Sequence, residues 1–263
     1  MICENCNQQC KFYTEKSGKM FYRCTLKSCA NVKVSIWHGT VFYNAKIPFH
    51  KIMLIFNLWL YETKIMKIVE MTKLSLKCIK RFIHLAESII IADLDEEDEL
   101  IGGEGIEVQI DESKFGKRKY NRGHQVNGVW ILGGVELTEE RKLFLKIVEG
   151  RSKRTLQEVI EKHVKKGSII VADCWRSYNG LNELDYGHYR VNHSKSFIDE
   201  TTGFHTNNIE GTWSAIKSKC STYQKTAKRI QGKLFEFIWR RKHFKDIWTS
   251  FIFAMSEIHV ENL

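Results

Sequence analysis

The chain has 263 residues, a hydrophobic share of 43% and a formal net charge of +10, values of a globular protein long enough to bury a sizeable core. The excess of positive charge favours a polyanionic partner such as nucleic acid over charge that serves solubility alone. No apolar run is long enough to cross a membrane and no signal peptide is visible, so the sequence predicts neither a membrane protein nor a secreted one.

Cysteine is concentrated at the amino terminus, where five of the eight cysteines lie in the first 29 residues. They include two close pairs, and two such pairs suit a tetrahedral Zn²⁺ ion. Because the segment has little apolar content, it needs a staple of this kind to fold; a small core of reduced cysteines is the alternative. We predict a zinc ribbon over residues 1–45, with Cys10 as a substitute ligand or a free thiol, and with these zinc ligands: Cys3, Cys6, Cys24 and Cys29.

Residues 46–92 are predicted to form three helices, at Phe49–Glu62, Lys64–Met71 and Ser75–Ile91. Pro48 at the start of the first costs no hydrogen bond, and Ser75 is a suitable N-cap for the third. Two helices joined by a short turn, the second of them basic, predict a helix-turn-helix domain, although any small helical bundle has the same pattern. The basic side chains off the apolar face of the third helix are predicted to contact DNA: Lys77, Lys80 and Arg81.

An acidic run followed by glycines predicts a solvated linker over residues 93–105. The next strand, Val108–Ser113, has the alternation of strand period and carries Asp111 where it runs out, with Glu112 on the opposite face. Two further strands, a helix and an apolar strand that ends on Asp173 follow, at Val129–Val135, Leu143–Val148, Ser152–Lys165 and Ser168–Asp173.

Three meander strands, a crossover helix and a fourth strand beside the first form the order of a ribonuclease-H-like sheet. We therefore predict an α/β catalytic domain over residues 106–225, a mixed sheet with flanking helices, and carboxyl-terminal helices over 226–263 packed on it. This strand order brings the ends of the first and fourth strands together, and with them Asp111 and Asp173.

A third acid, Glu210, lies near the start of a helix predicted to begin at Thr206 or Asn207. Lys217 follows seven residues later, about two turns, and so faces the same side of that helix. An aspartate at a strand end is usually a cap or turn residue, but two aspartates and a glutamate can together hold two Mg²⁺ ions.

Four runs of the sequence are distinctive: Asp111–Tyr120, Gly128–Gly134, Asp173–Tyr178 and His205–Glu210. They resemble the Merlin superfamily of DNA transposases, which are similar to bacterial insertion-sequence transposases with an ISXO2-like domain. The 36 residues between Asp173 and Glu210 match the spacing of that group, and the resemblance covers nearly the whole chain.

The resemblance implies a DDE transposase that cuts DNA at terminal inverted repeats and joins the 3′ ends to target DNA. By position, Asp111, Asp173 and Glu210 take the roles of catalytic acids and of ligands to two Mg²⁺ or Mn²⁺ ions. A domesticated or decayed copy that binds DNA through its zinc-containing part without chemistry is the alternative. The expected partner is double-stranded DNA bound by a homo-oligomer, in the nucleus of a eukaryotic host or otherwise in the cytoplasm with the nucleoid.

Further DNA contacts are predicted beside the acids, mostly to backbone phosphate, which gives affinity without sequence information. His205 either orients Glu210, touches a phosphate or is a surface residue, and Trp175 and Trp213 are interpreted as core residues. The predicted basic contacts are Lys114, Lys117, Arg118, Lys119 and Lys217.

Overall fold

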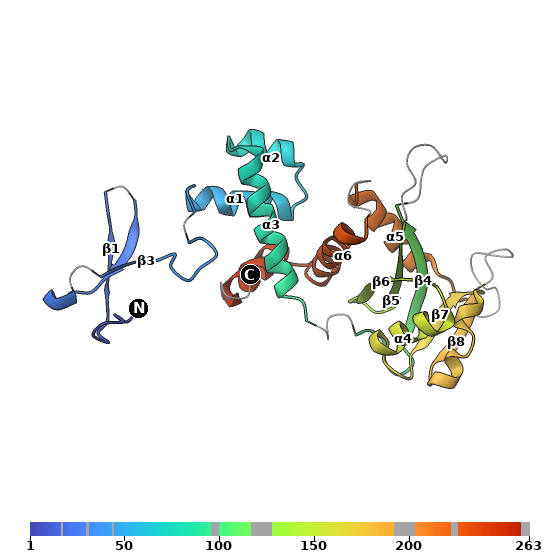
Figure 1. Ribbon diagram of the computed structural model, residues 1–263. Helices are drawn as coiled ribbons and strands as arrows, with labels where there is room; N and C mark the ends of the chain where they lie inside the picture. Colours follow the sequence, from blue (N-terminus) through green and yellow to red (C-terminus); the bar gives the residue numbers. More distant parts are fainter. Residues whose placement is uncertain are drawn as a thin grey trace. The chain divides into compact units, whose positions relative to one another are not determined.

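The computed structural model describes residues 1–16, 18–29, 32–43, 45–95, 100–116, 128–191, 203–221 and 226–258 (Figure 1). The chain divides into two compact units: Met1–Ile89 with Met255–Leu263, and Ile90–Ala254. Within the described ranges, no helix has both the length and the apolar character that a membrane span requires.

The first unit begins with a small antiparallel sheet in the order β1-β2-β3, with bounds Lys11–Thr14, Met20–Arg23 and Lys33–Ser35. Cross-strand aromatic pairs join its first two strands, Phe12 with Tyr22 and Tyr13 with Phe21. The buried cluster of this module consists of cysteines. Its packing therefore depends on what holds the thiols together.

Three helices follow in the first unit: α1 (Phe49–Leu60), α2 (Ile65–Thr72) and α3 (Leu76–Ala92). They confirm the three predicted helices to within the usual uncertainty of helix ends. The Ser75 hydroxyl accepts a hydrogen bond from the Cys78 amide at 3.3 Å, as expected of an N-cap. A T-shaped contact between Phe56 and Phe82 packs α1 against α3.

The second unit is built on a mixed sheet with the order β6-β5-β4-β7-β8. β4 pairs antiparallel with β5 and parallel with β7, so the predicted fourth strand does lie beside the first. A fifth strand, β8, extends the sheet in parallel beyond β7. The strands span Glu107–Phe115 (β4), Val129–Glu136 (β5), Leu143–Val148 (β6), Ile169–Asp173 (β7) and Gly187–Val191 (β8).

Helices cover both faces of this sheet, which makes the second unit a mixed α/β structure of three layers (Figure 1). On one face, Leu156 and Ile160 of α4 (Lys153–His163) pack into a core with Val108 and Ile110. On the other face, α5 (Asn207–Lys219) and α6 (Ala227–Lys242) close a second core. Two short 3-10 helices, η4 (Arg176–Tyr178) and η5 (Leu181–Leu184), follow β7, and α7 (Ile247–Glu257) follows α6.

The described residues between the predicted linker's acidic run and β4 pack against this sheet. Ile101 is fully buried in the α4 core and bridges to Val164. The Gly102 amide donates to the buried Glu136 carboxylate at 2.8 Å. The composition suggested a solvated segment here. Composition alone cannot show that a glycine amide, such as that of Gly102, finds a hydrogen-bond partner inside the fold.

Candidate functional site

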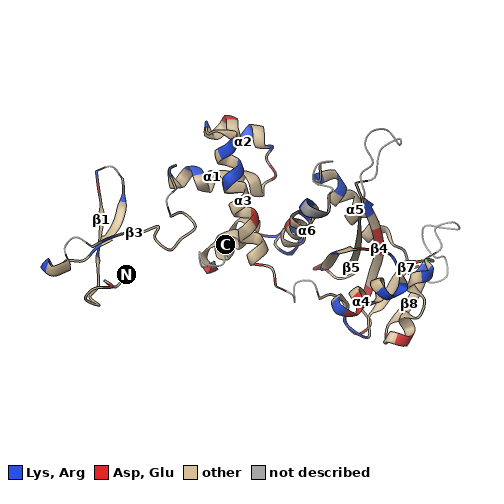
Figure 2. Ribbon diagram, viewed as in Figure 1, with Lys and Arg blue, Asp and Glu red and all other residues tan. Residues whose placement is uncertain are grey.

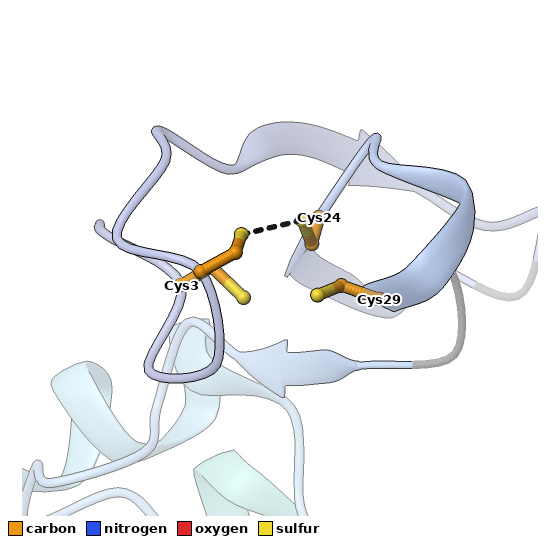
Figure 3. A group of neighbouring side chains, drawn as sticks. Cys3, Cys24 and Cys29 are labelled. Atoms are coloured by element: carbon orange, nitrogen blue, oxygen red, sulfur yellow. Dashed lines mark hydrogen bonds between the residues drawn. The ribbon is translucent and has the colours of Figure 1, made fainter.

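Four cysteine thiols meet at the end of the small sheet in the first unit. The Sγ atoms of the four predicted ligands, Cys3, Cys6, Cys24 and Cys29, all lie within 4.8 Å of one another. Figure 3 labels Cys3, Cys24 and Cys29. Cys10 is buried beside them but lies outside this set. The cluster can hold a metal ion such as zinc.

The pKa values of these thiols are shifted in opposite directions by their surroundings. A backbone hydrogen bond from Asn5 lowers the pKa of Cys3 to about 7, against the effect of burial. At Cys24, a backbone hydrogen bond from Leu26 lowers the pKa, but burial and the neighbouring thiols outweigh it and raise the pKa to about 12. One thiolate thus raises the pKa of the next, and the positive charge of a metal ion would offset this repulsion and favour the thiolate form of every ligand.

In the second unit, two of the three predicted acids lie side by side on the inner strands β4 and β7, at a place that we call the acid edge. β7 ends on Asp173 as predicted, but β4 continues past Asp111 to Phe115, so the prediction that the first strand runs out at Asp111 is wrong. β4 and β7 are parallel neighbours with Gln109 level with Val171, so Asp111 and Asp173, each two residues further on, fall at the same level. Side chains two residues apart on a strand share a face. Both aspartates therefore lie on the face that α5 covers, where burial leaves each only partly exposed.

Asp111 is held by α5 through a tryptophan. The Trp213 indole is buried and donates from Nε1 to Asp111 Oδ2 at 3.0 Å. Gly133 on β5 lies opposite Asp111, and a Cβ atom there would stand 2.6 Å from the indole ring. The absence of a side chain at Gly133 is therefore what lets Trp213 reach the carboxylate.

A buried glutamine fixes the start of α5. The Gln109 side-chain oxygen accepts hydrogen bonds from the backbone amides of Asn208 and Ile209, at 3.0 and 3.4 Å. Both amides belong to the first turn of α5, where the helix itself offers no acceptor, so the glutamine supplies it. Because this settles the orientation of the amide, its Nε2 donates to Nδ1 of His205 at 3.2 Å. His205, predicted to orient Glu210, to touch a phosphate or to be a surface residue, contacts Gln109 in this structure.

Glu210 lies in the first turn of α5 and accepts a hydrogen bond from the Thr206 hydroxyl at 2.9 Å. It stands one helical turn before Trp213, the residue that contacts Asp111. Within the described residues, the four cysteines are the one group of metal-ligating side chains that lie close enough together to hold an ion. Asp111, Asp173 and Glu210 do not form such a group in this structure.

The surroundings of Asp111 raise the pKa of its carboxyl group. Burial, followed by the charges of Glu112 and Asp173, raises its pKa to about 6, although the Trp213 N–H acts in the opposite direction. When folding raises the pKa of a carboxyl group, the stability that this group contributes to the fold is lost as the pH rises through the raised value. At neutral pH the charged form of Asp111 thus opposes folding, and a cation placed beside it would reverse the sign.

Glu112 lies on the α4 face, as strand alternation predicts. The Tyr178 hydroxyl donates to its carboxylate at 2.6 Å. Burial raises the pKa of Glu112, and Tyr178 and the charge of Arg151 partly offset this. It is a fourth carboxyl group at this edge of the sheet, held away from the α5 face.

The two tryptophans interpreted as core residues differ. Trp213 is in the core, but Trp175 is 42% exposed, so that interpretation is wrong for Trp175. Trp175 follows β7, and its amide donates to Asp173 Oδ1 at 2.9 Å. The Arg151 guanidinium lies over both its ring, at 4.7 Å, and that of Trp130, at 3.9 Å. Cation–π contacts of this kind hold the loop after Asp173 in place without burying the indole.

A family model of the ISXO2-like transposase domain matches residues 97–242, which is more than half of the chain. The chain belongs to the ISXO2-like transposase family. The predicted resemblance to these insertion-sequence transposases is therefore confirmed. The chain is also similar to an uncharacterized transposase-like protein of Haemophilus influenzae, with 29% identity over 100 residues that cover 38% of this chain and 80% of that protein.

Membership of a transposase family implies DNA binding in general, and the predicted DNA contacts lie in three places. Lys77, Lys80 and Arg81 are exposed along one side of α3, where with Leu76 and His84 they line a shallow depression (basic residues in blue in Figure 2). Lys114 and Lys217 flank the acid edge, over the rings of Trp130 and Phe115. The remaining three lie outside the described residues: Lys117, Arg118 and Lys119.

Gln109 and Gly133 organise the site but were not predicted as site residues. A glutamine between two apolar strand residues looks like a solvent-facing position, and only the cover by α5 makes it fully buried. A glycine inside a strand does signal a close approach of another group. It does not identify the group that approaches.

Replacing Gln109 by leucine should loosen the start of α5. Two backbone amides would lose their acceptor, and a buried unpaired group costs about 1–3 kcal/mol. We expect a lower melting temperature and faster hydrogen exchange at the amides of Asn208 and Ile209. Gln157→Leu on α4 is the matched control, since its side-chain amide donates to the Asn179 carbonyl at the surface. Unchanged exchange at both amides would contradict the role given to Gln109.

Proposed function

We propose that this chain is a DDE transposase that cleaves DNA at the terminal inverted repeats of its element and transfers the 3′ ends to target DNA. The proposal is carried by one observation: the family match over residues 97–242 includes two aspartates at the same level of adjacent parallel strands. The strand order and the crossover helix suit a ribonuclease-H-like catalytic fold.

The acids in this proposal are Asp111, Asp173 and Glu210, which would hold two Mg²⁺ or Mn²⁺ ions. The donor set fits hard divalent cations, because it consists of carboxylates and because burial, and then the neighbouring negative charges, raise the pKa of Asp111. When bound, the ions supply the activation of a water or 3′-hydroxyl and the stabilisation of the leaving oxygen.

The chain's own side chains would prepare this chemistry by orientation. Trp213 holds the Asp111 carboxylate by its N–H, and the Trp175 amide holds that of Asp173. The Gln109 amide anchors the helix that carries Glu210. Lys217, two turns after Glu210 on the same side of α5, would contact DNA beside the acids.

The remaining segments would bring DNA to these acids. We propose a zinc ribbon over residues 1–45 and a helix-turn-helix domain over 46–92 that uses Lys77, Lys80 and Arg81. The segment 93–105 would connect them to the catalytic domain of 106–225 and its carboxyl-terminal helices. Backbone phosphate would be bound by Lys114 and by three residues outside the described ranges, Lys117, Arg118 and Lys119, in a homo-oligomer assembled on DNA.

The test uses the full-length, zinc-loaded protein and duplex DNA that carries an end of its own element beside a target duplex. We expect nicked and joined products with Mg²⁺ or Mn²⁺ and none when the divalent ion is omitted. Omission is preferable to chelation, which would also remove zinc. Binding without products at any concentration of divalent ion would favour the non-catalytic DNA-binding protein, and cleavage without joining would favour a nuclease.

A further inference from the structure

A second basic site lies on the second unit, away from the acid edge. It is a groove between the turn that joins β5 to β6, helix α5 and helix α6, and we call it the arginine groove. Two guanidinium groups face it, those of Arg141 and Arg241. Asn208, Gly211, Thr212 and Phe237 are among its other lining residues, and no acidic residue is among the described ones.

The arginine groove uses a different side of α5 from the acid edge. Glu210, Trp213 and Lys217 follow one another at spacings of three and four residues and share one side. Positions 208, 211, 212 and 215 line the groove and lie about 100–200° around the helix from Glu210. The body of α5, about 10–12 Å across, therefore separates the two sites.

Both arginines are held against α5 by polar side chains. Arg141 donates from Nη2 to the Asn208 side-chain oxygen. Arg241 donates from Nη2 to the Thr212 hydroxyl at 3.3 Å, while its Nε is buried and has no partner among the described residues. Burial, and then the charge of Arg141, lower the pKa of Arg241. Two like charges thus share one groove with a buried donor still to be satisfied, an arrangement that an anion would complete.

The positive surface continues from the groove along α6. A neighbouring depression shares Arg241 and is lined by Lys142, Lys242 and Lys245. Its single acidic residue, Glu140, pairs with Lys142 at 3.1 Å. An extended polyanion would find successive cations here, whereas a small anion would use only the two guanidinium groups.

We propose that the arginine groove binds a phosphate group of the DNA backbone, at a point separated by α5 from the phosphate held at the acids. The inference rests on the proposed function in that DNA is the polyanion. The planar, forked guanidinium suits phosphate oxygens, and a contact of this kind gives affinity and position without reading sequence. The groove would thus help hold the duplex across α5.

The test measures DNA binding by full-length, zinc-loaded protein without added Mg²⁺, at several salt concentrations. Arg141→Gln and Arg241→Gln should each weaken binding about eightfold at 0.1 M salt and reduce the slope of log affinity against log salt by about 0.9, the value for one phosphate contact. Arg154→Gln is the matched control: it removes one charge from an exposed arginine on α4, paired with Glu158 at 2.8 Å, and should change neither quantity.

Arg141 is exposed, so its variant decides the matter even if Arg241→Gln fails to fold. If the wild type binds DNA and Arg141→Gln has the same affinity for DNA and the same salt slope, the groove proposal is overturned. The proposed function is then unaffected. Absence of DNA binding by the wild type would overturn the proposed function and the groove proposal together. A third measurement adds orthophosphate and records the melting temperature of both proteins. If orthophosphate raised that of the wild type but not that of Arg141→Gln, while both proteins bound DNA equally, the groove would be a site for free phosphate only. This result would also overturn the proposal.

Discussion

Asp173→Asn is expected to reduce metal-dependent DNA cleavage and joining by at least about 10³-fold, since metal-ion stabilisation of developing charge is worth several kcal/mol. Asparagine has the same shape but cannot supply the negative charge that a divalent ion requires. Its side-chain oxygen can still accept the Trp175 amide, as Asp173 does at 2.9 Å. The fold and the affinity for DNA should therefore remain close to those of the wild type.

The matched control for this substitution is Asp185→Asn. Asp185 is exposed and has a φ of 65°, a left-handed conformation that asparagine tolerates. Cleavage and joining are measured as product formed with time in Mg²⁺, and binding by fluorescence anisotropy without Mg²⁺. If Asp173→Asn kept its activity, or lost DNA binding together with activity, the acid site proposed here would be wrong.

Loss of the proposed zinc ion is the second change with a large expected effect. The module at the amino terminus buries a cluster of cysteines and little else, and binding of a structural zinc ion is worth about 10–16 kcal/mol in small peptides. Cys24→Ser should remove about one zinc ion per chain and unfold this module. The second unit, which has two apolar cores of its own, should melt as in the wild type.

Cys10→Ser is the matched control for the zinc site. Cys10 is buried in the same module but lies outside the set of four thiols, so its variant should keep the metal. Zinc content is measured on the purified proteins by elemental analysis, and folding of the module by amide exchange in β1 to β3. Retention of zinc by Cys24→Ser, or equal loss from both variants, would contradict the assignment of ligands.

Elements with a strong local pattern could be predicted from the sequence. The three helices of the first unit and the strand that ends on Asp173 have nearly the expected bounds because apolar periodicity is visible in a short window. The strand that carries Asp111 instead continues to Phe115. Trp175 shows where such reasoning fails. An indole is usually buried, but this one lies in the loop after β7, where cation–π contact with Arg151 holds it at the surface.

The sequence by itself determined which segments are strands and helices, which four cysteines gather in space and which strands carry the two aspartates, because spacing and residue type express these properties locally. Only the tertiary structure decided how α5 lies on β4. That placement depends on Trp213 meeting Asp111 above a glycine, and on Gln109 meeting the amides of Asn208 and Ile209. These partners lie about a hundred residues apart and leave no periodic signal, since a buried polar contact becomes specific only after both faces of the sheet are covered.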